Sequence, residues 1–73
     1  MNIEQKVKEI AAEQFCVDLD TVTNEATFES LGADSLDIVE FTMTLEDEFN
    51  IAIENDAIEQ LDTIQGFVDL VTN

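Results

Sequence analysis

The residue types in this chain allow little catalytic chemistry of their own. Its 73 residues include no histidine, tryptophan, tyrosine or proline, and Cys16 is the single cysteine. Without histidine the chain cannot form the Ser–His or Cys–His pairs that activate many nucleophiles, and zinc loses one of its usual ligands. One cysteine cannot make an internal disulfide of the kind that staples small secreted proteins. The composition therefore argues against a self-contained enzyme, and we expect no metal site.

Ser35 is the hydroxyl with the most informative local setting. It follows Asp34, a residue type preferred at the N-cap of a helix, and would lie in the first turn of a predicted helix. Free backbone N–H groups and the positive end of the helix dipole favour a phosphate at that place. Ser35 is therefore suited to carry a phosphate ester. Serine is also common in the first turn of ordinary helices, and the spacing alone favours that plainer interpretation.

The charge balance excludes several classes of partner. The chain has 18 Asp and Glu residues against 2 Lys and Arg residues, which gives a net charge of −16 at pH 7. Nucleic-acid phosphates need cationic partners, and anionic membrane surfaces attract basic segments, so we expect neither. Hydrophobic residues make up 45% of the chain, too many for a disordered acidic tail. Strong like charge also favours a monomer.

The N-terminal segment predicts where the protein is located. Residues 1–15 contain Glu4, Glu9 and Glu13 and no apolar run, unlike a secretory signal peptide. No stretch of the chain approaches the roughly 20 apolar residues of a membrane span. We therefore expect a cytoplasmic protein that does not insert into membranes.

Hydrophobic periodicity predicts four helices. The longer ones cover residues 3–15, 35–50 and 63–71, and a short one lies near residues 55–60. No segment alternates with a period of two for long enough to form a strand. We expect an all-α fold, a small four-helix bundle (three longer helices plus one short helix) with a long loop between the first and second helices. At this length, residues 1–73 form one domain.

The long loop and the helix ends carry further expectations. We expect the apolar residues of the loop to pack onto the core; they are Val17, Leu19, Val22 and Phe28. Thr63 is the expected N-cap of the last helix. Cys16 is predicted to be a small, semi-buried residue near the end of the first helix, with a stray reactive thiol as the alternative.

The second predicted helix carries two apolar stripes. Successive residues lie about 100° apart around the axis, which places the core-facing set on one stripe: Ile38, Phe41, Thr42, Leu45 and Phe49. Roughly 100–160° away lie Leu36, Val39 and Met43, with the acids Glu40, Glu46 and Asp47 around them and Asp37 further round the helix. An apolar patch with an acidic rim is typical of a docking surface for a basic partner. Packing of the second stripe against the loop or another helix is about equally favoured, and the acids could simply be solvated.

Residues 31–37, Leu-Gly-Ala-Asp-Ser-Leu-Asp, resemble the attachment signature of the acyl carrier proteins of free-standing, type II fatty-acid synthesis. The segments Val22-Thr23-Asn24 and Leu45-Glu46-Asp47-Glu48-Phe49 also resemble that family. The resemblance extends over nearly all of the chain and includes its acidity. A bare Asp-Ser-Leu would be a weak signal, but this heptamer in an acidic chain of this size is a specific one.

The resemblance implies a covalent cofactor and a set of partners. Ser35 would be esterified by 4′-phosphopantetheine, transferred from coenzyme A by a phosphopantetheinyl transferase that uses Mg²⁺, and Asp34 would cap the helix beside the phosphate. The thiol of the arm would hold growing acyl chains as thioesters and present them to fatty-acid synthesis enzymes with basic docking patches.

The resemblance also assigns two groups of residues. The partner-facing residues would be Leu36, Asp37, Val39, Glu40, Met43, Glu46 and Asp47. A pocket for the acyl chain between the helices would be lined by Phe28, Phe41, Leu45, Phe49, Ile58, Leu61 and Phe67, which could equally be plain core. Two departures from the family bear on which acyl chain fits: the loop at residues 28–31 is one residue shorter than usual, and residues 51–56 lack the usual proline.

Three alternative functions remain open from the sequence. A carrier for polyketide, peptide or D-alanine transfer is the nearest. A calcium-binding loop would use Asp18, Asp20 and Glu29, but Thr23 stands where that loop needs its glycine. An acidic decoy that occupies a basic protein surface would leave Ser35 unmodified.

Overall fold

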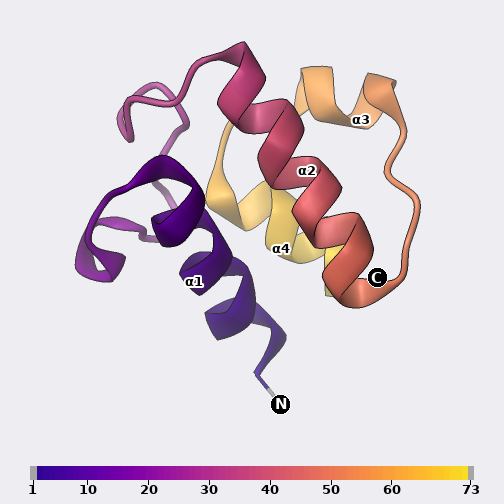
Figure 1. Cartoon of the computed structure of the whole chain (residues 1–73), viewed down its shortest axis with the longest axis horizontal. Helices are drawn as coiled ribbons and strands as arrows, with labels where there is room; N and C mark the ends of the chain where they lie inside the picture. The colour runs from indigo at the N-terminus through magenta and orange to yellow at the C-terminus, as the bar shows by residue number, and fades with distance from the viewer. Residues whose placement is uncertain (1, 73) are drawn as a thin grey trace.

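The computed structural model describes residues 2–72, without the side chain of Asn55, and it contains four α-helices. Their bounds are Ile3–Phe15 (α1), Ser35–Phe49 (α2), Asn55–Gln60 (α3) and Ile64–Thr72 (α4). Helix α1 packs against both α2 and α4, while α3 lies at the edge of the bundle (Figure 1). The all-α prediction is confirmed. The sequence did not predict a 3-10 turn at Leu19–Thr21 (η1) or an isolated antiparallel bridge between Thr27 and Thr63.

The core contains a cluster of four phenylalanine rings, which we call the aromatic cluster: Phe15, Phe28, Phe41 and Phe67. Neighbouring ring centroids lie 5.3 to 6.0 Å apart, mostly edge to face. Such pairs contribute about 0.5–1.5 kcal/mol beyond their buried area. Because the rings come from α1, the long loop, α2 and α4, the cluster joins these four segments of the chain.

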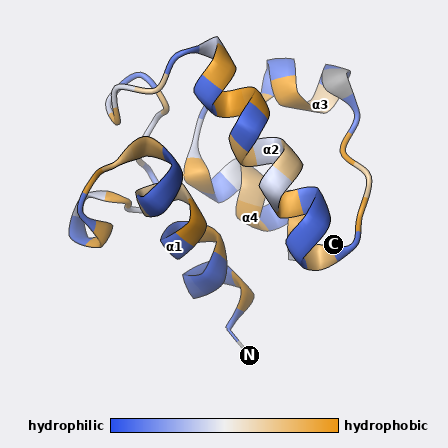
Figure 2. Ribbon diagram, viewed as in Figure 1, coloured by the Kyte–Doolittle hydropathy of each residue, from blue (hydrophilic) through white to orange (hydrophobic). Residues whose placement is uncertain are grey.

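The hydropathy of each helix follows its place in the bundle. Figure 2 shows hydrophobic residues along much of α4, whereas hydrophobic and hydrophilic residues alternate around α2. Val7 and Ala11 of α1, together with Leu45 of α2 and Ile64 of α4, are completely buried. None of the helices within residues 2–72 has the length and apolar character needed to cross a membrane.

Most of the long loop packs as expected. Val22 and Phe28 are buried, and Val17 packs partly buried against the core. The expectation for Leu19 is wrong, because this residue opens the η1 turn on the surface and is 39% exposed. The expectation for Cys16 is also wrong. This residue ends α1 in the left-handed conformation, with φ of 57°, and is exposed, because the turn takes it off the apolar stripe of the helix.

Backbone hydrogen bonds fix the loop to the start of α4. Ile64 N–H donates to the Ala26 carbonyl at 3.1 Å, and Gln65 N–H donates to the Asn24 carbonyl at 2.9 Å. Gly66 N–H donates to Thr63 Oγ1 at 3.3 Å, which confirms Thr63 as the N-cap of α4. The loop that leads to Ser35 is therefore held at its middle by a helix from the other end of the chain.

The ion pairs offset little of the negative charge. Lys6 lies 3.9 Å from Glu48, and Lys8 lies 3.7 Å from Glu4. Exposed pairs of this kind contribute about 0–1 kcal/mol each. The remaining acids repel one another, and this repulsion opposes a compact fold.

We therefore expect salt to stabilise the protein. Raising NaCl from about 0.01 to 0.15 M shortens the Debye length from about 30 to 8 Å, so the melting temperature should rise by several degrees. Thermal scans by circular dichroism test this, with equal osmolarity of sucrose as the uncharged control. A melting temperature that is flat or falls with salt would contradict the role assigned to charge repulsion.

Candidate functional site at the start of α2

A reciprocal cap begins α2 at Ser35. Asp37 N–H donates to Asp34 Oδ1 at 3.0 Å, and Asp34 N–H donates to Asp37 Oδ2 at 3.3 Å. This capping box satisfies two backbone donors at once, here with aspartate at both positions. The structure confirms Asp34 as the N-cap and gives Asp37 the second half of the same device.

The turn before α2 is closed by local hydrogen bonds. Thr27 and Ser30 each donate a backbone N–H to the other's hydroxyl, at 3.1 and 3.0 Å. Ala33 N–H donates to the Phe28 carbonyl at 2.9 Å. Gly32 has φ of 76°, a left-handed conformation that residues with a side chain rarely adopt. This turn presents Ser35 as an exposed residue in the first turn of the helix.

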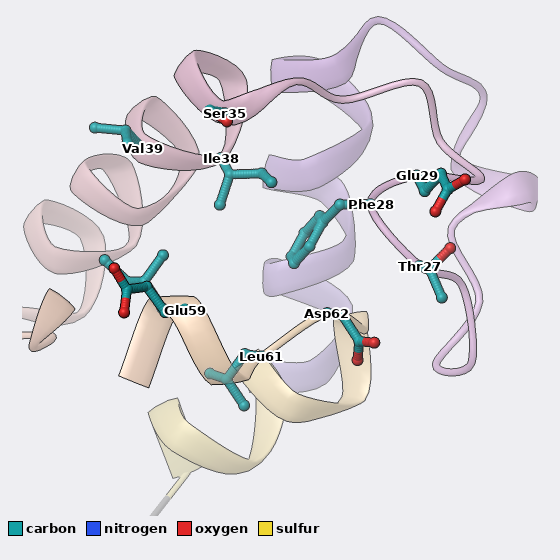
Figure 3. Close-up of a pocket in the computed structure, with 10 residues that line it drawn as sticks. Thr27, Phe28, Glu29, Ser35, Ile38, Val39, Glu59, Leu61 and Asp62 are labelled. Carbon is teal, nitrogen blue, oxygen red and sulfur yellow. The ribbon is translucent and has the colours of Figure 1, made fainter. Parts of the chain in front are cut away.

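An open cleft of about 570 Å³ lies beside Ser35, between α2, α3 and the end of the long loop (Figure 3). Pockets of this size that are mostly apolar are typical of small-molecule sites. In Figure 3 the side chains of Phe28 and Ile38 point into this space. The cleft is lined by Thr27, Phe28, Glu29, Ser35, Ile38, Val39, Ile58, Glu59, Leu61 and Asp62.

The structure divides the residues that were candidates for an acyl pocket. Phe28, Ile58 and Leu61 line the cleft. The other four, Phe41, Leu45, Phe49 and Phe67, pack in the core and do not line it. The inward face of α2 is closed by the aromatic cluster, so the open space lies to one side of it.

Sequence reasoning did not predict two of the apolar residues that line the cleft. Ile38 was assigned to the core stripe of the second helix, and Val39 to the outward stripe. Both line the cleft, which lies at the boundary between the two stripes. The sequence did contain a signal for this. Ile38 and Val39 are adjacent, so their side chains point about 100° apart around the helix, one on each stripe.

The outward stripe of α2 is uncovered. Leu36 is 64% exposed, Val39 46% and Met43 59%. This excludes the alternative in which the stripe packs against the loop or another helix. Glu40 and Asp47 beside it are also exposed.

Some of the surrounding acids have contacts of their own. Glu46 Oε2 accepts a hydrogen bond of 2.8 Å from Ile53 N–H and so ties α2 to the connection with α3. Glu40 Oε2 accepts one of 3.0 Å from Gln14 Nε2 of α1. Within the part of the chain that the structure describes, no three His, Cys, Asp or Glu side chains gather in a way that could hold a metal ion. Asp18, Asp20 and Glu29, the acids of the calcium-loop alternative, are therefore not brought together in such a group.

Comparison with known proteins decides the family. Residues 5–71 match the family model described as phosphopantetheine attachment site. The acyl carrier protein from Thermotoga maritima, known from a crystal structure, has 40% sequence identity to this chain. The two structures match with a TM-score of 0.79 over 92% of this chain and 79% of that one. The chain belongs to the acyl carrier protein family. A second solved acyl carrier protein, from Enterococcus faecalis, is 34% identical with a TM-score of 0.79, over 94% of this chain and 89% of that one.

Membership of the acyl carrier protein family confirms the resemblance read from the sequence. The family is one of carriers and not of catalysts, and it takes phosphopantetheine as a covalent cofactor. Its members are served by phosphopantetheinyl transferases and bear acyl chains.

The capping box predicts the effect of one substitution. Asp34→Ala should destabilise the protein by about 1 kcal/mol, because an N-cap acceptor is lost. For a domain of this size the melting temperature should fall by about 4–8 °C. Asp47→Ala is the matched control, since it removes the same charge from the exposed C-terminal half of α2 and should leave the melting temperature equal or higher. Equal melting temperatures for the two variants would contradict the role of the box.

Proposed function

We propose that this chain carries growing fatty-acyl chains between fatty-acid synthesis enzymes, on a 4′-phosphopantetheine arm esterified to Ser35. The observation that carries the proposal is the position of Ser35, which is exposed in the first turn of α2 at the edge of an apolar cleft. The proposal includes a cytoplasmic, monomeric protein with one domain over residues 1–73.

The residues around Ser35 fit the phosphate of the arm. Asp37 N–H donates to Asp34 Oδ1, whereas the N–H groups of Ser35 and Leu36, the first two residues of α2, have no intrahelical acceptor. Those donors and the helix dipole favour a phosphodiester on the Ser35 oxygen. When bound, the group supplies a terminal thiol that holds an acyl group as a thioester. The protein positions the attachment point and shields what is attached.

The chemistry of the cleft supports an alkyl chain as cargo. Phe28, Ile38, Ile58 and Leu61 offer hydrocarbon surface, and burying an alkyl chain against them removes it from water. A charged aminoacyl group would gain less from such a surface. The cleft therefore favours fatty-acyl transfer over peptide or D-alanine transfer.

The exposed stripe and its acids support docking to basic enzymes. Leu36, Val39 and Met43 can be buried by a partner, and Glu40 and Asp47 can attract its cationic residues. A carrier must leave each enzyme after every step, so contacts that speed association suit it better than very tight binding. The tether raises the effective concentration of the cargo at the docked enzyme.

Attachment at Ser35 can be measured by intact mass. After incubation with coenzyme A, Mg²⁺ and a broad-specificity phosphopantetheinyl transferase, wild type should gain one phosphopantetheinyl group. Ser35→Ala should gain none, whereas Ser30→Ala, which removes the only other serine, should still gain the group. An unmodified, folded wild type that stays unchanged would overturn the proposal and bring the decoy function forward.

Charge reversal tests the docking surface. Glu40→Lys or Asp47→Lys should slow acyl transfer to enzymes with basic docking patches several-fold at low salt, and should reduce the salt dependence of the rate. Glu25→Lys is the matched control, because it makes the same charge change on the exposed part of the loop that is bonded to α4. Equal rates for all three variants would argue against docking through α2.

A further inference from the structure

A glycine in α4 leaves room for a residue that lines the cleft. A Cβ atom added to Gly66 would lie 2.8 Å from Leu61 Cδ2, and 3.6 Å from Leu61 Cβ and Cγ. Real Cβ atoms almost never come within 3.0 Å of a heavy atom of a residue that is not their chain neighbour. Glycine is costly inside a helix, and here it coincides with a close packing contact. Leu61 can hold its present position because position 66 has no side chain.

Hydrogen bonds hold the backbone around Leu61 and oppose its movement away from Gly66. Leu61 N–H donates to the carbonyls of Ala57 and Ile58 at 3.1 and 3.3 Å, which closes the end of α3. The next residue, Asp62, accepts a hydrogen bond of 3.1 Å from Phe28 N–H. A methyl group at position 66 would therefore displace the end of the Leu61 side chain and not the Leu61 backbone.

The displacement would narrow the cleft. Leu61 lines the cleft and also lies against the place of a Cβ atom at Gly66, whereas Gly66 itself does not line the cleft. Figure 3 shows Leu61 at the end of α3, where the chain turns into α4. Because Leu61 borders the cleft, we expect its displaced side chain to occupy part of the space that Phe28 and Ile38 face.

We propose that Gly66 is a specificity-determining residue, which sets the length of the alkyl chain that the cleft accepts by leaving room for Leu61. The proposal rests on the proposed function, with Ser35 as the attachment point of the acyl-bearing arm. It assigns the limit on chain length to the contact between α4 and the end of α3, and not to the phenylalanine rings of the core.

The test compares thermal stabilisation by acyl chains of increasing length. Wild-type protein is loaded at Ser35 with saturated acyl groups from butanoyl to dodecanoyl, and loading is verified by intact mass. Each methylene that the cleft shields from water should raise the melting temperature, until the chain exceeds the space. The length at which the melting temperature stops rising is the readout.

Gly66→Ala should shift this limit to chains about one or two methylenes shorter, because the added methyl group and the displaced Leu61 side chain take up the space. Leu61→Ala should shift the limit to longer chains, and the double variant should reverse the effect of Gly66→Ala. Thr72→Ala, at the exposed far end of α4, is the control that should keep the wild-type limit. Alanine favours a helix more than glycine does, so Gly66→Ala should remain folded.

An unchanged limit in fully loaded Gly66→Ala would overturn the inference. A wild type whose melting temperature does not depend on chain length would also overturn the inference. The mass gained on loading Ser35 would still support the proposed function in that case. If Gly66→Ala fails to fold, Leu61→Ala decides alone, and an unchanged limit there overturns the inference. Failure of wild type to gain mass at Ser35 overturns the proposed function together with the inference.

Discussion

Packing among Phe15, Phe28, Phe41 and Phe67 joins separate parts of the chain into one core, and other features of the fold depend on it. The chain has a net charge of −16 and two lysines to offset its acids. A domain of this size buries only about 60% of its unfolded surface, so apolar contact must overcome the repulsion with few residues. Aromatic rings suit this task, because each buries a large area and pairs edge to face with its neighbours.

The same packing decides what each side of α2 can do. Phe41 and Leu45 are drawn fully into the core. The outward stripe points away from that core and remains exposed. The cleft opens between these two faces, where α3 stands at the edge of the bundle and not over the core. The core, the cleft and the exposed stripe thus all depend on how this one helix is placed.

Contacts between distant segments hold Ser35 at the border of these faces. The capping box starts α2 at that residue, and this device is local. The loop before it is held by α4 through Asn24 and Ala26, which are bonded to Gln65 and Ile64. On the other side of the cleft, Glu46 fixes the connection to α3 through Ile53. Hydrogen bonds therefore fix the segments on both sides of the cleft beside Ser35, although the Ser35 side chain itself is exposed.

The sequence by itself determined the four helices, the caps at Asp34 and Thr63, the acidity and the attachment signature around Ser35. These features depend on neighbours within a few positions, where spacing and residue type suffice. Only the tertiary structure decided that Leu36, Val39 and Met43 stay exposed, that Cys16 and Leu19 lie at the surface, and that Ile38 lines the cleft while Phe49 does not. Periodicity gives the direction of a side chain around its own helix, but the element that covers that direction is set by contacts between segments far apart in the chain.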